Sequence, residues 1–238
     1  MNRRVSTAFA VILIPATLFV IAAGCGKSEK KVVKPPMMEL AIVKADTVSL
    51  FDGSNLDAWT MENPGGWAIA DSAMTIAKGG SIWTRERFGD FDLSLEFKVS
   101  REGNSGVFIR IGDLKDPVQT GIEMQILDSA GKAKPDKHDS GALYDLLEPS
   151  SNAMKPAGEW NRAVITCHMN HITIEMNGTQ IIAADLDRWT TPHKNPDGSE
   201  NKFNLALKDF PREGHIGFQD HGFPVWFRNV MVKKMKMR

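Results

Sequence analysis

The sequence predicts an all-β protein built as a sandwich of two antiparallel sheets. Many short runs alternate apolar and polar residues between turn residues, which is typical of half-buried strands. Asn177-Gly178 separates two such runs and indicates a hairpin, because a type I′ turn needs positive φ at both central positions. Only NKFNLALKD has a helical look, and it is short. Strands without helices between them favour antiparallel pairing over a parallel α/β sheet.

Residues 1–24 are predicted to be an export signal, because Arg3 and Arg4 precede the apolar run AFAVILIPATLFVIAAGC. The small residues before Cys25 resemble the lipobox at which bacterial lipoproteins are cleaved and acylated, although Ala22 stands where that motif usually has Leu. The alternative is an uncleaved membrane helix, since the run is just long enough to span a bilayer. Both place the protein outside the cytoplasm, on the periplasmic face of a membrane or at the cell surface.

A linker and one domain are predicted after the signal. Residues 25–48 hold the lipidated Cys25 and a spacer with Lys and Pro residues, and residues 49–238 are long enough for one compact domain. The chain has 29 basic and 29 acidic residues; seven basic and three acidic ones precede Ser49, so the domain holds 22 and 26. This balance argues against a nucleic-acid partner. Cys167, in AVITCHM, is predicted to be a buried thiol, so no disulfide is expected.

The predicted strands follow in chain order. They are FDLSLEFKV, SGVFIRIG, GIEMQIL, NRAVITCHM, ITIEM with TQII, GHIGFQD and VWFRNVMV. The tight turns in HMNHI and MNGT join three of them into one meander. The segment from Asp185 to Glu213 contains three prolines and is predicted to be a long loop. Trp189 and Phe203 would dock it over one face of the sandwich.

Several stretches together resemble one bacterial family, the 3-keto-disaccharide hydrolase domain, from about Leu50 to Val232. They are LFDGSNLDAW, FDLSLEFKVSREGNSGVFIR, GIEMQILD, SGALYDL, GEWNRAVITC, NPDGSENKF and REGHIGFQDHGFPVWFRNV. The resemblance implies a concanavalin-like jelly-roll sandwich and cleavage of glycosides whose C3 hydroxyl has been oxidised to a ketone. Related members are similar to lyases that carry out the first half of that reaction.

Cleavage of such a substrate needs fewer catalytic groups than hydrolysis of an ordinary glycoside. The ketone acidifies the hydrogen on C2, so a single base can remove it, form an enediolate and expel the aglycone; water then adds across the double bond. The site needs a base, a donor for O3 and an acid at the leaving oxygen. The saccharide must be oxidised first, which implies an upstream sugar-oxidising enzyme. No cofactor is expected, because no phosphate-loop motif is present.

Glu123 is the candidate base. Gln125 projects to the same side of its strand, and Arg110 would lie beside Glu123 if the strand VFIRI pairs next to it with Phe108 and Arg110 facing alike. A guanidinium there would keep the carboxylate ionised and donate to an oxyanion. The alternative is a solvent-facing sheet on which these residues are ordinary exposed polar side chains with no role in catalysis. Gly106 would let a ligand approach the backbone.

His221 and His138 are the other candidate catalytic residues, because their unperturbed pKa lies near neutrality. The candidate substrate contacts are Gln125, Asp128, Tyr144, Trp189, Lys208, Gln219 and Asp220. Tyr144 has the alternative of a half-buried strand aromatic. A divalent metal on His138, Asp139 and Glu123 is a further alternative, and the metal ligands are left open.

Two other functions fit the sequence. One is a non-catalytic carbohydrate-binding sandwich, in which Trp189 and Trp83 stack on sugar rings. The other is a hydrolase of unoxidised glycans that uses Glu123 and Asp128. Their strand is similar in spacing to the catalytic strand of sandwich-fold laminarinases and lichenases, where three acids alternate.

Overall fold

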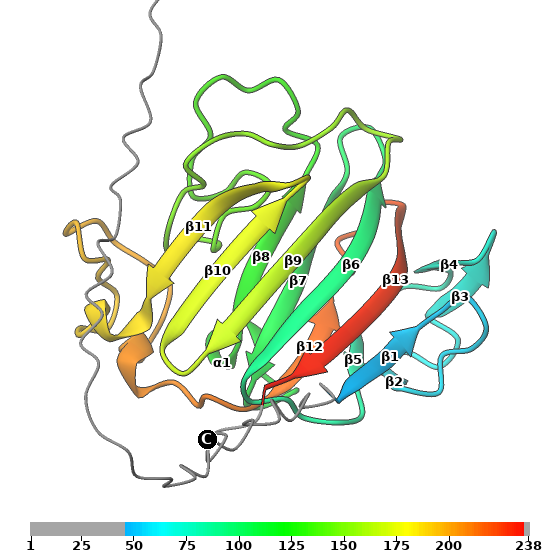
Figure 1. Cartoon of the computed structure of the whole chain (residues 1–238), viewed down its shortest axis with the longest axis horizontal. Coiled ribbons are helices and arrows are strands. Elements are labelled where there is room, and N and C mark those ends of the chain that lie inside the picture. Colours follow the sequence, from blue (N-terminus) through cyan, green and yellow to red (C-terminus); the bar gives the residue numbers. More distant parts are fainter. Residues whose placement is uncertain (1–45, 236–238) are drawn as a thin grey trace, which may run out of the picture. The chain divides into compact units, whose positions relative to one another are not determined.

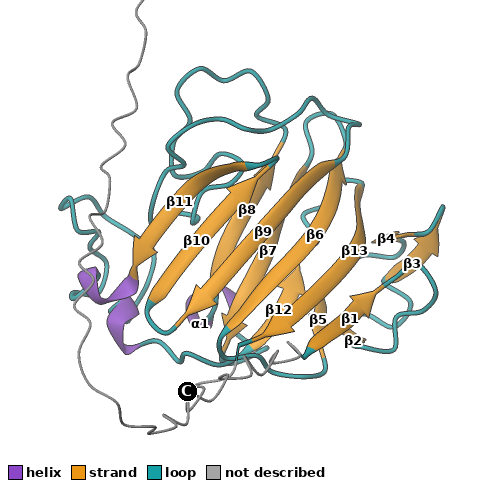
Figure 2. Ribbon diagram, viewed as in Figure 1, coloured by secondary structure: helices purple, strands orange, loops and turns teal. Residues whose placement is uncertain are grey.

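The computed structural model describes residues 46–235, and the predicted export signal and Cys25 lie outside this range. The described chain forms two antiparallel sheets (Figure 1), so the predicted sandwich is confirmed. The only helices within this range are single turns, drawn purple in Figure 2 among orange strands: α1 (Pro117–Thr120), η1 (Leu186–Arg188) and η2 (Leu207–Asp209). Within residues 46–235 no helix is long and apolar enough to cross a membrane.

The larger sheet has eight strands and the smaller has five. The larger runs in the order β11 (Thr179–Asp185), β10 (His171–Met176), β9 (Asn161–His168), β6 (Phe91–Val99), β13 (Val225–Lys234), β4 (Ala73–Ile76) and β3 (Trp67–Ala70), and β1 (Thr47–Phe51) also pairs with β13. The smaller runs in the order β2 (Trp59–Met61), β5 (Ile82–Thr84), β12 (His215–Phe218), β7 (Asn104–Ile111) and β8 (Ile122–Leu127).

The core lies between the sheets and follows from strand alternation. In β6 every second residue from Phe91 to Val99 is buried, and the residues between them are only partly buried. Phe218 of β12 stacks on Phe227 of β13 with ring centroids 3.9 Å apart, which ties the two sheets together. Cys167 is fully buried, as predicted, and burial raises the pKa of its thiol to about 12.

The predicted meander of β9, β10 and β11 is confirmed. Asn177 and Gly178 both have positive φ, 51° and 84°, and join β10 to β11 between the partners Met176 and Thr179. The side-chain amide of Asn177 also donates to the carbonyl of Ala153 at 2.8 Å, which anchors the turn to the neighbouring loop. Local turn chemistry therefore fixes this hairpin.

A β-bulge in β7 decides where its side chains point. Phe108 pairs with Gly217 and Ile111 with His215, so two residues of β7 lie opposite one residue of β12. The second of the two, Arg110, has φ of 53°. Phe108 and Ile111 consequently share one small apolar cluster with Trp83, separate from the main core.

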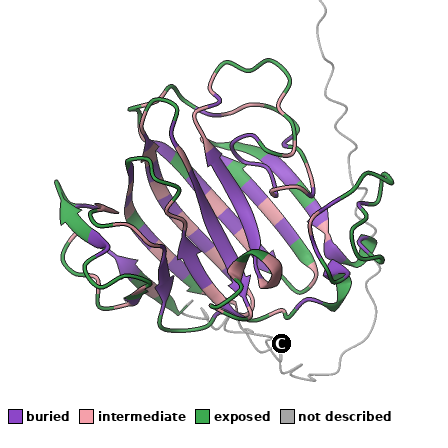
Figure 3. Ribbon diagram, turned by 180° about the vertical axis from the view of Figure 1, so that it is seen from behind, coloured by how far each residue is buried: buried purple, intermediate pink, exposed green. Residues whose placement is uncertain are grey.

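Strand β8 is buried on both faces, although it belongs to an antiparallel sheet. Five of its six residues are buried, including Glu123 and Gln125. Figure 3, which looks onto the five-stranded sheet, shows this continuous burial along the two long strands. A solvated outer face would alternate instead, so other parts of the chain must cover β8.

The segment from Asp185 to Glu213 is part of that cover, as predicted. Trp189 and Phe203 are buried and dock it. Gln119, in α1, donates to the carbonyl of Lys202 at 2.9 Å and accepts from the backbone N–H of Asn204 at 3.0 Å. The segment therefore reaches the outer face of the five-stranded sheet next to Glu123.

Candidate active site

A cavity of about 280 Å³ opens over the outer face of β7 and β8. It is smaller than most drug-sized ligand pockets, so its size suits a single sugar ring. The strands supply Glu123, Gln125 and Asn104, while Tyr144, Lys202 and the loop after β12 form the remaining walls. The residues that line it are Asn104, Val118, Glu123, Gln125, Tyr144, Lys202, Gln219 and His221.

Glu123 is the only carboxylate among these lining residues. It is 5% exposed, and the Lys202 ammonium lies 3.9 Å from Oε2. Burial raises the pKa of Glu123 to about 7, and the positive charge of Lys202 opposes that rise. A carboxyl with this pKa is partly ionised near neutrality, which is the range in which a general base works best.

Gly106 makes room for the Glu123 carboxyl. A Cβ built on Gly106 would lie 2.1 Å from Oε1, a distance that no real contact reaches. A ligand was predicted to approach the backbone at Gly106, whereas in the structure the group that approaches is the Glu123 side chain. Gln125 lies beside it: with its amide nitrogen turned toward Glu123 it donates to Oε1 at 3.3 Å and to the carbonyl of Ser105 at 3.0 Å.

Lys202 and Tyr144 form another part of the cavity wall. The Lys202 ammonium lies 4.4 Å from the centre of the Tyr144 ring. Burial lowers the pKa of Lys202, and the charges of Glu123 and Asp145 oppose this. Burial, followed by the negative charges of Glu123 and Asp145, raises the pKa of Tyr144, so its phenol keeps its proton at neutral pH. The site thus places two donors beside one base.

Sequence reasoning missed Lys202 and chose Lys208 in the same segment. The structure places Lys208 on η2, exposed and outside the lining of the cavity. An irregular segment has no periodicity from which to read the direction of a side chain. The one signal was the stretch NPDGSENKF in the family resemblance, which contains Lys202.

The predicted pairing of Arg110 with Glu123 is wrong. The bulge turns Arg110 away from that face, and its guanidinium donates to Asp90 at 3.0 Å and to the carbonyls of Met169 and Gly89 at 2.7 and 3.2 Å. Its side chain is 1% exposed. Arg110 therefore fastens β7 to the turns at one end of the larger sheet.

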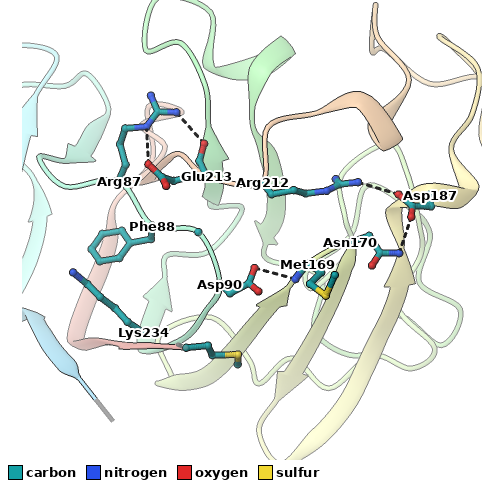
Figure 4. A pocket seen from close by; sticks show the side chains of 11 residues that line it. Arg87, Phe88, Asp90, Met169, Asn170, Asp187, Arg212, Glu213 and Lys234 are labelled. Atoms are coloured by element: carbon teal, nitrogen blue, oxygen red, sulfur yellow. Dashed lines mark hydrogen bonds and ion pairs between the residues drawn. The ribbon is translucent and has the colours of Figure 1, made fainter. Parts of the chain in front are cut away.

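A larger hollow, of about 770 Å³, lies around those turns (Figure 4). Its carboxylates are paired with cations: Arg212 pairs with Asp187 at 3.0 Å, Arg87 with Glu213 at 3.7 Å, and Arg110 with Asp90 at 3.0 Å. The side chains of Asp90, Asp187 and Glu213 are 11%, 59% and 66% exposed, against 6% for Glu123, so the smaller cavity holds the more deeply buried carboxyl and is the better candidate despite its size.

The structure gathers some predicted residues around Glu123 and not others. Gln125, Tyr144, Gln219 and His221 line the cavity. Tyr144 lies in a loop, outside every strand. His138 is beside the cavity but does not line it, since its ring packs edge-on to Tyr144 at 5.0 Å and Nε2 lies 3.3 Å from Asp145.

Three predicted substrate contacts have structural partners instead. Asp128 accepts the backbone N–H of Glu102 at 2.9 Å. Asp220 accepts from the backbone N–H groups of Gly80 and Gly222, each at 2.8 Å. Trp189 is 3% exposed and donates to Asn195 at 2.8 Å. None of the three lines the cavity, because each side chain is used to hold a loop in place.

The suggested metal trio is not assembled. Asp139 accepts from the backbone N–H of Asp136 at 2.6 Å and pairs with Lys132 at 2.6 Å. Within residues 46–235 no group of three or more His, Cys, Asp or Glu side chains is arranged to hold a metal ion.

Comparisons with known proteins agree with this architecture. Residues 46–233 match the model of the 3-keto-alpha-glucoside-1,2-lyase-like domain. A protein of Bacteroides thetaiotaomicron named 3-keto-disaccharide hydrolase is 28% identical, over 85% of this chain and 83% of its own. A crystal structure of a candidate glycosyl hydrolase from Parabacteroides distasonis is 34% identical, with a TM-score of 0.73, and covers 79% of this chain and 99% of its own.

A Bacillus subtilis protein with a galectin-like fold is 15% identical, with a TM-score of 0.51, and covers 81% of this chain and 96% of its own; this likeness shows the fold alone. The jelly-roll sandwich implied by the sequence is thus confirmed. Over residues 46–233 the chain belongs to the 3-keto-alpha-glucoside-1,2-lyase-like domain family.

Proposed function

We propose that this protein is an enzyme that cleaves the glycosidic bond of 3-keto-glycosides by removing the proton on C2 and eliminating the aglycone. The observation that carries the proposal is the single buried carboxyl of Glu123, with a pKa of about 7, at the base of a cavity that suits one sugar ring. The relatives named as 3-keto-disaccharide hydrolase and as a glycosyl hydrolase support the same substrate class.

The cavity supplies a group for each step. The Glu123 carboxylate takes the C2 proton, and the electron pair of the C2–H bond moves toward the ketone, which places negative charge on O3. Lys202 and Tyr144 donate to that oxygen. The electron pair then returns to form the C1–C2 double bond as the C1–O bond breaks, and the aglycone oxygen takes up a proton from Glu123 or His221. Adding water across the double bond completes a hydrolysis.

The two rival functions have less support. Direct hydrolysis of an unoxidised glycoside requires two carboxyl groups across the bond, and Asp128 is bonded to Glu102 and does not line the cavity. A binding module would stack sugar rings on exposed tryptophans, but Trp189 and Trp83 are 3% and 5% exposed.

The test supplies the purified protein with a 3-keto-disaccharide and with its unoxidised parent, and follows the products by mass. We expect cleavage of the ketone alone. An unsaturated keto product identifies a lyase, and a product with water added identifies a hydrolase. Cleavage of the parent but not the ketone would contradict the proposal.

Glu123→Gln should lower turnover of the ketone by roughly 10²- to 10⁴-fold, since the amide cannot accept the C2 proton. Glu175→Gln, an exposed change on β10, is the matched control and should leave turnover unchanged. Turnover by Glu123→Gln within a few-fold of the parent protein would remove Glu123 from the chemistry.

The setting of the enzyme is proposed from the sequence. The N-terminal run before Cys25 supports an exported lipoprotein held at a membrane by its lipid. The substrate supports an upstream partner reaction, the oxidation of a glycoside at its C3 hydroxyl.

A further inference from the structure

Asp145 joins the two loops that carry Tyr144 and Lys202. Its Oδ2 accepts the backbone N–H of Lys202 at 2.7 Å. Its Oδ1 lies 3.0 Å from the ammonium of Lys137 and 3.3 Å from Nε2 of His138. Both carboxylate oxygens are therefore engaged, one with each loop.

The backbone of Asp145 is also held by hydrogen bonds. Its φ is 65°, a left-handed conformation that aspartate adopts more readily than most residues other than glycine. Its N–H donates to the carbonyl of Lys137 at 2.9 Å, and its carbonyl accepts from Asn195 at 3.1 Å. Asn195 in turn accepts the indole N–H of Trp189 at 2.8 Å. These bonds fix the backbone of Asp145 between the loop of Lys137 and the segment that contains Asn195.

We propose that Asp145 is the positioning residue of this site, and that its carboxylate holds the Lys202 ammonium beside Glu123. The inference rests on the proposed function for its catalytic consequence, and on the contacts and charges around Lys202 for its effect on Glu123. Asp145 does not line the cavity, so it acts through Lys202 and not on the substrate.

The carboxylate is needed because it accepts on both oxygens at once. An asparagine has one acceptor oxygen and one donor nitrogen. Whichever way it is turned, its NH₂ faces either the N–H of Lys202 or the ammonium of Lys137. Asp145→Asn is therefore expected to release one of the two loops.

Charge is the second part of the argument. The titratable groups that share the cavity with Lys202 are Glu123, Tyr144 and His221. Asp145 lies outside the lining and contacts the Lys202 backbone N–H, Lys137 and His138. The negative charge of Asp145 favours the ammonium form of Lys202. The ammonium in turn opposes the rise in the pKa of Glu123. Loss of the Asp145 carboxylate should therefore raise the pKa of Glu123, and the effect should act through Lys202.

The experiment follows the titration of the Glu123 carboxyl by ¹³C NMR in the full chain labelled at glutamate Cδ, without substrate, with Glu123→Gln to assign the signal. Asp145→Asn and Lys202→Met should each move the midpoint upward from about 7. The double variant should move it no further than Lys202→Met alone, because both act through one ammonium. Asp139→Asn, a buried carboxyl of the same loop that pairs with Lys132, should leave it unchanged.

An unmoved midpoint in a folded Asp145→Asn protein overturns the proposal. So does an equal shift in Asp139→Asn, or a shift by Asp145→Asn that persists in the Lys202→Met background, since either result would mean general loosening of the loop.

With a 3-keto-disaccharide, kcat/KM of Asp145→Asn should fall on the order of 10- to 100-fold, and the acid limb of its pH profile should move to higher pH. A parent protein inactive on the ketone would refute the proposed function, while the NMR midpoints would still decide the role of Asp145.

Discussion

Among the described residues, Lys202 is the one cation that lies beside the buried carboxyl of Glu123. The 5% exposure of Glu123 removes hydration from the ionised form, and one ammonium at 3.9 Å restores only part of what is lost. Burial makes Glu123 a useful base at neutral pH, and the same burial should make its ionised form destabilise the folded state. Residues tuned for proton transfer are found in such environments.

The pH dependence of stability follows from the raised pKa. The unfolded carboxyl ionises near its ordinary value of 4.5, whereas the folded one keeps its proton up to about pH 7. Between these values the folded state binds more protons, so its contribution to stability is full below pH 4.5 and is lost as the pH rises to 7. The loss is on the order of 3 kcal/mol at most.

Glu123→Gln should therefore be more stable than the parent protein at pH 8 and nearly equal to it at pH 4.5. Urea denaturation at the two pH values measures the difference. Glu175→Gln, on the exposed face of β10, should show no comparable gain. A variant that unfolds more readily at pH 8 would show that ionised Glu123 stabilises the fold.

Gly106→Ala should abolish most activity while the fold survives. The added methyl group would meet the Glu123 carboxyl at 2.1 Å, so that flexible side chain must move away from its place. Turnover of the 3-keto-disaccharide should fall on the order of 10²-fold, as expected for a displaced catalytic group. Gly89→Ala is the control, because its Cβ would have no neighbour nearer than 3.9 Å. Full activity in Gly106→Ala would mean that catalysis does not require the Glu123 carboxyl in its position against Gly106.

At the scale of the element, the bulge in β7 explains the error about Arg110. Strict alternation puts Phe108 and Arg110 on one face, and the extra residue breaks that alternation between Ile109 and Ile111. The sequence VFIRI contains no glycine or asparagine to signal a residue with positive φ. The bulge depends on the pairing of β7 with β12, which is a tertiary contact.

Arg110→Met should destabilise the protein by about 3–5 kcal/mol, because it leaves Asp90 with one fewer partner in a buried ion pair. Urea denaturation at pH 7 measures the loss. Arg228→Met removes the pair with Glu96, whose side chains are 37% and 27% exposed, and should lose much less. If Arg110→Met kept its stability but lost turnover, Arg110 would belong to the chemistry after all.

At the scale of the whole molecule, function depends on what covers the smaller sheet. One face of β7 and β8 packs into the core, and loops from distant parts of the chain close over the other. Tyr144, Lys202 and His221 are separated by tens of residues in the sequence, yet they line one cavity with Glu123. A rigid sandwich that positions residues on loops is a common arrangement for catalysis.

Cys25→Ala should prevent membrane attachment. Cells that express the full chain would be labelled with a radioactive fatty acid and fractionated. The parent protein should carry label and sediment with membranes, whereas the variant should carry none. Cys167→Ala is the control, because that thiol is fully buried. Label on the Cys25→Ala protein would contradict the predicted lipid anchor.

The sequence by itself determined the strands from Phe91 onward, the meander and the hairpin at Asn177-Gly178, because alternation and turn chemistry act over a few residues. The short strands β1 to β5 were not among those predicted. The choice of Glu123 as the carboxyl to test needed the family resemblance in addition to alternation. Only the tertiary structure decided that Lys202 and not Arg110 is the cation beside Glu123, and that Trp189 and Asp128 hold loops in place. The direction of a side chain in a bulge or an irregular loop depends on partners far away in the chain. The local sequence pattern therefore cannot predict that direction.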